Sequence, residues 1–296
     1  MSRNKMTAEE AREFDAQFNW RDLPPVTNPI IHNYRCLAKL FWILFIGTGA
    51  IILAIIVFPL LKIFVHPKEK FRNKAQRFVS AGFRFFMKLL DVSGIVKILI
   101  DKETKEKLFN LHSKIVVANH PSILDTVIMI TLIPNATVIA SQKYEHGPLG
   151  GVIRACYIIN SLDFDELCDR CRETLSYGSN VIIFPEGTRT PRHGHNQYKK
   201  GAARIARATK SDILPFFLGG SDKFGLGKNN PFWSFNTVEP LIYHVVPLGE
   251  ICIDDYMDLT DPISAKRITN EIHDRIMTKA EEYKKDHPYT RTVNNV

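Results

Sequence analysis

The sequence predicts an α/β fold, a mixed sheet flanked by helices, with an N-terminal hydrophobic helical segment that anchors the chain to a membrane. Strand-like apolar runs alternate with helix-like segments between residues 114 and 218, which is typical of a sheet covered by helices. A long uncharged run at 40–61 precedes them, and an amphipathic helix-like segment at 264–284 follows. These three observations define the expected architecture.

The chain divides into four predicted segments. Residues 1–36 are a polar arm, 37–66 a membrane anchor, 67–92 an amphipathic helix, and 93–296 the catalytic domain. The anchor is predicted because 40–61 carries no charged residue and is long enough to cross the roughly 30 Å hydrocarbon core of a bilayer. A cleavable signal peptide is not expected, since a long polar stretch comes first.

Glycine and proline in the anchor leave two geometries open. Gly47, Gly49 and Pro59 are compatible with a helix that spans the membrane and with one that enters and returns. Basic residues then follow between 62 and 77. By the positive-inside rule they place the catalytic domain on the cytoplasmic side of a cytoplasmic (inner) membrane.

The segment 67–92 interleaves aromatic and basic residues. Phe71, Phe78 and Phe85 lie among Arg72, Lys74, Arg77 and Arg84. This pattern suits a helix at the lipid headgroup boundary, and it equally suits a helix that packs on the catalytic domain.

The catalytic domain is expected to alternate strands and helices. Strands are expected at 114–118, 137–141, 157–160, 180–184, 213–218 and 237–246, and helices at 122–132, 148–155, 163–177, 201–209 and 264–284. Two motifs follow the strands at 114–118 and 180–184. They therefore fall at carboxyl ends of strands, where ligands of open α/β sheets bind.

Composition narrows the function classes. The 296 residues are 45% hydrophobic with a formal net charge of +8, which suits anionic lipid or an acidic carrier protein. Nucleic acid is not expected, because no recognisable reader motif is present. The five cysteines are scattered and odd in number, so reduced thiols are expected. We interpret Cys168-x-x-Cys171 as a coincidence within a helix, because no second pair exists.

The first motif, Asn119–Asp125, places a histidine five residues before an aspartate. Histidine titrates near neutral pH and can take a hydroxyl proton when a carboxylate orients it. Pro121 keeps His120 in the loop, with Ser122 expected as N-cap and Asp125 at N3. For Asp125 alone, a capping box is the favoured interpretation. No serine or cysteine nearby has a nucleophile-elbow setting, so His120 is expected to activate the substrate's own hydroxyl.

The second motif, Phe184–Arg189, is a predicted tight turn with a guanidinium. Pro185 and Gly187 shape the backbone, and Arg189 offers a planar fork that matches phosphate. Taken alone, a strand-ending turn with a solvated arginine explains the motif as well. Backbone amides at this turn or at Pro121 are expected to stabilise an oxyanion.

Together, the two motifs resemble the PlsC-like glycerolipid (lysophospholipid) acyltransferase family. The resemblance runs from about residue 71 to 246 and includes Lys143, Pro148, 198–202 and 213–215. It implies that His120 is the general base and Asp125 its partner. It also implies that Glu186, Gly187, Thr188 and Arg189 bind a phosphate-bearing acceptor.

The resemblance implies transfer of an acyl chain from an acyl-CoA or acyl carrier protein thioester to a lysophospholipid hydroxyl. The first expectation is 1-acyl-glycerol-3-phosphate as acceptor, giving phosphatidic acid. No metal or other cofactor is expected, because a thioester is already activated. His193 and His195 could ligate a metal, but a third ligand is not apparent.

One departure from the family concerns the acceptor. The family has an arginine where Asn160 stands in this sequence. Lys143, Arg154 and Lys199 are candidates to supply the missing charge. Other readings remain open: the same chemistry on another lysolipid, a glycolipid or a polyene-type lipid, a thioesterase or lipid hydrolase, or a non-catalytic lipid-binding protein.

Overall fold

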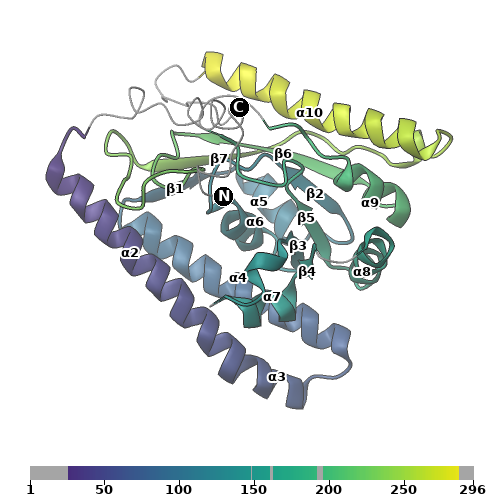
Figure 1. Cartoon of the computed structure of the whole chain (residues 1–296), viewed down its shortest axis with the longest axis horizontal. Helices are drawn as coiled ribbons and strands as arrows, with labels where there is room; N and C mark the ends of the chain where they lie inside the picture. The colour runs from purple at the N-terminus through teal and green to yellow at the C-terminus, as the bar shows by residue number, and fades with distance from the viewer. Residues whose placement is uncertain (1–25, 148, 161–162, 192–195, 287–296) are drawn as a thin grey trace, which may run out of the picture.

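A seven-stranded mixed sheet forms the centre of the protein (Figure 1). The computed structural model describes residues 26–147, 149–160, 163–191 and 196–286. The strand order is β1-β7-β6-β2-β5-β3-β4. The strands are β1 Val96–Leu99, β2 Ile115–Ala118, β3 Ala136–Ala140, β4 Ile158–Ile159, β5 Asn180–Ile183, β6 Ile213–Gly220 and β7 Leu241–Pro247. Only the β6–β7 pair is antiparallel in this sheet, so the expected mixed α/β fold is confirmed.

Helices cover both faces of the sheet, and each face has its own hydrophobic core (Figure 1). The helices are α2 Pro29–Ile52, η3 Leu53–Val57, α3 Phe58–Phe64, α4 Lys68–Val92, α5 Lys102–Phe109, α6 Asp125–Leu132, η4 Gln142–Tyr144, α7 Gly150–Cys156, α8 Phe164–Ser176, α9 Gly201–Thr209, η5 Asp254–Tyr256 and α10 Asp261–Asp286.

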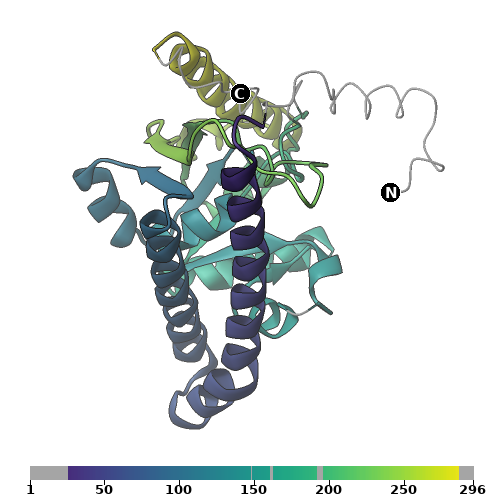
Figure 2. The same ribbon diagram turned by 90° about the vertical axis from the view of Figure 1, so that its left-hand side faces the viewer.

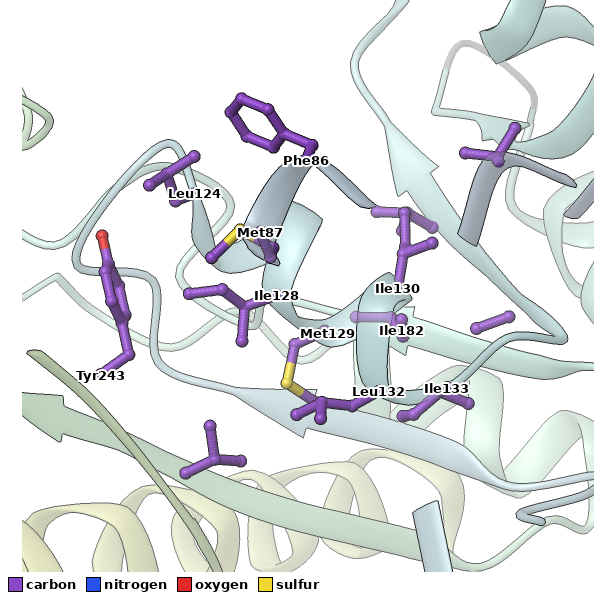
Figure 3. Close-up of a cluster of buried hydrophobic side chains, with 14 of the residues drawn as sticks. Phe86, Met87, Leu124, Ile128, Met129, Ile130, Leu132, Ile133, Ile182 and Tyr243 are labelled. Carbon is purple, nitrogen blue, oxygen red and sulfur yellow. The ribbon is translucent and has the colours of Figure 1, made fainter. Parts of the chain in front are cut away.

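The two cores follow from the alternation of side chains along the strands. In β2, Val116 belongs to the core under α4 and α6, whereas Ile115 and Val117 belong to the core under α8, α9 and α10. Figure 3 shows the first core, in which α6 contributes Ile128 and Met129. Both faces of the central strands are therefore buried, which explains their continuous apolar sequence.

One long helical segment, Pro29–Phe64, precedes the catalytic domain. Asn28 caps it by accepting hydrogen bonds from the amides of Ile30 and Ile31. The helix thus begins eight residues before the boundary expected at residue 37. Residues 1–25 of the expected polar arm lie outside the described residues.

A π-helical turn, η3, interrupts this segment just before Pro59. Proline has no N–H, and its ring crowds the carbonyl four residues earlier. The amide of Phe58 bonds to the Leu53 carbonyl instead, which widens the helix by one residue. The proline therefore produces a π turn within a continuous helix.

Most of the Pro29–Phe64 segment is exposed, and only 6% of its most apolar stretch is buried. By length and composition it can cross a membrane. Figures 1 and 2 show α2 and α3 lying along α4. Aromatic pairs join them, with the rings of Trp42 and Phe86 at 5.5 Å and those of Phe58 and Phe71 at 6.1 Å.

Helix α4 packs on the catalytic domain, one of the two roles expected for 67–92. It buries Ala75, Val79 and Phe86, and the Ser80 hydroxyl donates to the Ile130 carbonyl of α6 at 2.7 Å. Phe78 stays exposed on its outer side. The domain boundaries themselves remain predictions.

Candidate active site

The two motifs meet at one edge of the sheet because their strands are parallel neighbours. Val117 of β2 stands opposite Ile183 of β5. His120 lies three residues after Val117, and Glu186 lies three residues after Ile183. Since neighbouring strands are about 4.8 Å apart, the two loops lie side by side.

His120 and Asp125 form the pair expected from the sequence. The Nδ1 atom of His120 lies 2.8 Å from Oδ2 of Asp125. The Asp125 side chain is fully buried, whereas the His120 side chain is 18% exposed. Because a carboxylate only accepts, Nδ1 carries the proton. Nε2 has no hydrogen-bond partner among the described residues, so its lone pair is available to a substrate.

Asp125 also makes the bonds expected of a capping residue. Its Oδ2 accepts from the Ser122 amide at 2.7 Å, and its Oδ1 accepts from the Ser122 hydroxyl at 2.7 Å. The two interpretations of Asp125 therefore hold together. Ser122 is not the N-cap, however, because residues 122–124 form a turn and α6 begins at Asp125 after the N-cap residue Leu124.

Phe184 fixes the plane of the histidine ring. The rings of His120 and Phe184 stack at 4.2 Å with an angle of 19° between their planes. The apolar residue at the end of β5 thus restrains the side chain at the end of β2. No pattern in the sequence indicates this role for Phe184.

Glu186 holds the two loops together. Its Oε1 accepts from the His120 amide at 2.9 Å and from the Thr190 hydroxyl at 2.7 Å, and its Oε2 accepts from the Asn196 amide group at 2.6 Å. The side chain is buried, and this burial raises the pKa of its carboxyl. The carboxylate is thus engaged with protein groups, and the acceptor-binding role expected of Glu186 stays a prediction.

Gly187 and Thr188 are exposed at the tip of the second loop. Gly187 has a φ of +67°, and a Cβ there would lie 2.8 Å from Nζ of Lys199. The Lys199 amide bonds to the Pro185 carbonyl at 2.8 Å. The loop therefore keeps a lysine ammonium directly over its exposed glycine.

Arg189 donates from Nη1 to the carbonyls of Leu226 and Gly227, at 3.1 and 2.7 Å. Leu226 also accepts from the Ile123 amide beside His120 at 3.1 Å. The connection between β6 and β7 thus contacts both motifs. The sequence carries no signal that this connection reaches the site.

The amides expected to stabilise an oxyanion are partly engaged within the protein. The Gly187 amide bonds to the Phe184 carbonyl at 3.0 Å, and the Ser122 amide bonds to Asp125. The Thr190 amide bonds to the His120 carbonyl at 2.7 Å. These three amides serve to hold the loops.

Lys143 and Arg154 lie farther along the same edge. Lys143 follows β3, with Nζ 4.7 Å from the centre of the Tyr144 ring. Arg154 of α7 donates to the Glu145 carbonyl at 2.7 Å. Asn160, at the end of β4, is three strands from β2, or roughly 14 Å. The position of the missing arginine is therefore distant from the histidine.

Cysteines and metal-ligating residues add no second site in the described part of the chain. No group of three or more His, Cys, Asp or Glu there could hold a metal. Burial raises the pKa of the Cys156 and Cys171 thiols to about 12, so they are unreactive. His193 and His195 lie outside the described residues.

Comparisons with known proteins agree with these two motifs and this fold. Residues 99–219 match the family model described as Acyltransferase. The chain thus contains a region that is similar to acyltransferases of this family. The crystal structure of the 1-acyl-sn-glycerophosphate acyltransferase PlsC from Thermotoga maritima has the same fold, with a TM-score of 0.63 over 86% of this chain and 98% of that chain. Because the two sequences are only 19% identical, this similarity is evidence for the fold alone.

Two curated proteins that are similar to part of this chain carry the same activity name. A 1-acyl-sn-glycerol-3-phosphate acyltransferase of Cocos nucifera is 30% identical over 115 residues, which cover 36% of this chain and 37% of that protein. The beta 1-acyl-sn-glycerol-3-phosphate acyltransferase of Homo sapiens is 26% identical over 167 residues, covering 54% and 60%. The matched region thus spans 37% and 60% of these relatives' lengths.

Proposed function

We propose that this protein is a membrane-bound O-acyltransferase that moves a fatty acyl group from an acyl thioester to a lysophospholipid hydroxyl. The 2.8 Å contact between His120 Nδ1 and the buried Asp125 carboxylate carries this proposal. It leaves Nε2 as a base at a sheet edge that also holds Lys199 and Arg189. The match of residues 99–219 to the Acyltransferase family model supports acyl transfer as the reaction.

In the proposed reaction, Nε2 of His120 takes the proton from the acceptor hydroxyl as that oxygen attacks the thioester carbonyl. A C–O bond forms, the C–S bond breaks, and the thiolate leaves. The imidazolium returns its proton to the thiolate, so the histidine ends the cycle neutral. Asp125 stabilises the imidazolium in between, and it holds the required tautomer.

The acceptor is proposed to bind by its phosphate at the second loop. Lys199 lies over Gly187, and the Arg189 guanidinium of the same loop donates from Nη1 to the carbonyls of Leu226 and Gly227. Lys143, farther along the edge, completes the basic border. Thr188 offers an exposed hydroxyl. These groups match the charge of 1-acyl-glycerol-3-phosphate, with phosphatidic acid as product.

The Pro29–Phe64 segment is proposed to anchor the domain in the membrane where its lipid substrate resides. Its exposed apolar surface and low burial support this role. The basic residues that follow support a position of the catalytic domain on the cytoplasmic side. Acyl-CoA or acyl carrier protein would then approach from the cytoplasm.

A second candidate is the same transfer to a different lysolipid. Asn160 stands where the family has an arginine, and Arg154 bonds to the Glu145 carbonyl. An acceptor with a smaller or masked phosphate charge would suit this arrangement.

The test uses the full chain in detergent with acyl-CoA or acyl carrier protein thioesters. Lysophosphatidic acid and other lysolipids are offered separately, and thiol release and lipid product are followed by mass spectrometry. Acceptor-dependent phosphatidic acid supports the first candidate, and a product only with another lysolipid supports the second. Thiol release with free fatty acid and no acceptor dependence would show a thioesterase and overturn both.

A further inference from the structure

We propose that Tyr243 is a positioning residue that acts through Ser122 and Asp125 to hold the His120 imidazole in its productive tautomer. The kinetic part of this inference rests on the proposed function. The structural part concerns only the hydrogen bonds of the histidine. Tyr243 belongs to β7, far from either motif in sequence.

A continuous chain of short contacts joins the tyrosine to the histidine. The Tyr243 hydroxyl lies 2.7 Å from the Ser122 hydroxyl, which lies 2.7 Å from Oδ1 of Asp125. Oδ2 of the same carboxylate lies 2.8 Å from His120 Nδ1. Tyr243, Ser122 and Asp125 are all fully buried. No water-exposed group is needed to complete this path.

The direction of the protons follows from the acceptor at its end. A carboxylate oxygen accepts, so the single Ser122 hydroxyl proton points to Asp125. Ser122 Oγ must then accept from Tyr243, and it also accepts from the Leu124 amide at 3.1 Å. The tyrosine is therefore the terminal donor. Donation to a hydroxyl strengthens that hydroxyl as a donor in turn.

Lys223 supplies a buried positive charge behind the tyrosine. Its Nζ lies 4.5 Å from the centre of the Tyr243 ring, and it donates to the carbonyls of Gly219, Ser221 and Ile242. A cation over the ring face is attracted to it and helps to fix the ring. The Lys223 charge also interacts favourably with the buried Asp125 carboxylate.

Strand β7 can place the tyrosine there because it approaches β6 closely at Gly220. The pair Gly220 and Tyr243 stand opposite each other in the antiparallel ladder. A Cβ at Gly220 would lie 2.0 Å from the Ile242 carbonyl oxygen. Figure 3 shows the Tyr243 hydroxyl directed toward the loop that carries Leu124. The reversed strand thus delivers a donor beneath the catalytic loop.

The first test is kinetic and uses the substitution Tyr243→Phe, which keeps the ring over Lys223 and removes the hydroxyl. We expect kcat to fall about tenfold with the acceptor KM unchanged, since a tenfold loss corresponds to a lost hydrogen bond of about 1.4 kcal/mol. In a protein that already carries Ser122→Ala, Tyr243→Phe should lower kcat by less than about twofold. An equal loss in both backgrounds would overturn the inference.

A matched control removes a hydroxyl hydrogen bond elsewhere. Tyr256 donates its hydroxyl to Glu271 on the α10 side of the protein. Tyr256→Phe should therefore leave kcat unchanged. A comparable kcat loss in this control would show that general destabilisation, not the path to His120, lowers activity in Tyr243→Phe.

The second test does not depend on acyl transfer. Nitrogen-15 NMR of histidine-labelled protein, with His120→Ala to assign the signals, reports which ring nitrogen carries the proton. The wild type should show His120 with a protonated Nδ1, and both Tyr243→Phe and Ser122→Ala should shift it toward a mixture of tautomers. An unchanged signature in both variants would overturn the inference, even for a protein whose reaction differs from the proposed one.

Discussion

The Glu186 carboxylate accepts a hydrogen bond from the backbone amide of His120 at 2.9 Å. A buried acid of the second motif therefore fixes the backbone of the first. Thr190 and Asn196 donate to the same carboxylate, so the Glu186 side chain is fixed in the position that bonds the His120 amide. The two motifs form one rigid unit, in which the base and the basic loop are set relative to each other.

This relationship predicts distinct results for two substitutions of Glu186. Glu186→Gln keeps an oxygen for the His120 amide, so activity should fall less than about tenfold. Glu186→Ala leaves buried donors unpaired, at about 1 to 3 kcal/mol each, and should lower kcat about a hundredfold and lower the melting temperature. Steady-state kinetics and thermal unfolding check both. A change confined to the acceptor KM would contradict the bracing role.

Gly187→Ala should raise the acceptor KM. The residue has a φ of +67°, and the added methyl would meet the Lys199 ammonium. Non-glycine residues pay about 1 kcal/mol or more in this backbone region, and the lysine must move. Lys199→Met should raise the same KM. Gly82→Ala is the control, because its helical site has no atom near the new methyl; an equal rise in KM there would refute the explanation.

Lys39→Met should destabilise the connection between β6 and β7. The buried Lys39 ammonium of α2 donates to the carbonyls of Ser234, at 2.9 Å, and of Gly225 and Phe232. Arg189 bonds to the same connection. We expect a melting temperature lower by several degrees and a raised acceptor KM. The exposed Lys62 of the same helical segment is the matched control, and Lys62→Met should change neither quantity.

Lys223 predicts a pH dependence of stability. Burial lowers its pKa to about 8, and the nearby Asp125 carboxylate partly opposes this shift. Below pH 8 the lysine is charged in the folded and unfolded states, so the folded state bears the full cost of burying the charge. Between pH 8 and about 10.4 the folded state sheds its proton first, so stability rises in this window.

The comparison that isolates this effect is the melting temperature of the wild type against Lys223→Met at pH 7.5 and 9.5. All other groups titrate equally in both proteins, so their contributions to the difference in melting temperature cancel. The melting temperature of the wild type, relative to that of the variant, should be higher at pH 9.5 than at pH 7.5. If the difference in melting temperature between the two proteins is the same at both pH values, the lowered pKa of Lys223 is contradicted.

Much of the sheet and both motifs could be predicted because local patterns determine them. Apolar runs such as 180–184 are buried on both faces, and His120 and Glu186 directly follow such runs. Strand β1 and helix α5 are not among the strands and helices expected from the sequence. The expected strand at 237–246 begins only at Leu241, after Pro240, which has no N–H for a ladder.

The rest of the site depends on contacts between distant residues. Tyr243 falls within the expected strand 237–246, and no local feature of the sequence indicates that its hydroxyl contacts Ser122. Lys223 lies outside the strands and helices expected from the sequence, and Lys39 lies at the start of the expected anchor. Carbonyl groups surround both ammonium groups. The family resemblance implies an acceptor-binding role for Glu186, and only the fold shows which groups its carboxylate reaches.

The central claim is that His120 acts as the base for acyl transfer. The most direct measurement is formation of phosphatidic acid from acyl-CoA and lysophosphatidic acid by the wild type and by His120→Ala, at matched melting temperatures. General-base catalysis contributes roughly a hundredfold to ten-thousandfold, so the variant should lose at least a hundredfold in kcat. Full activity in a folded His120→Ala protein would contradict the mechanism.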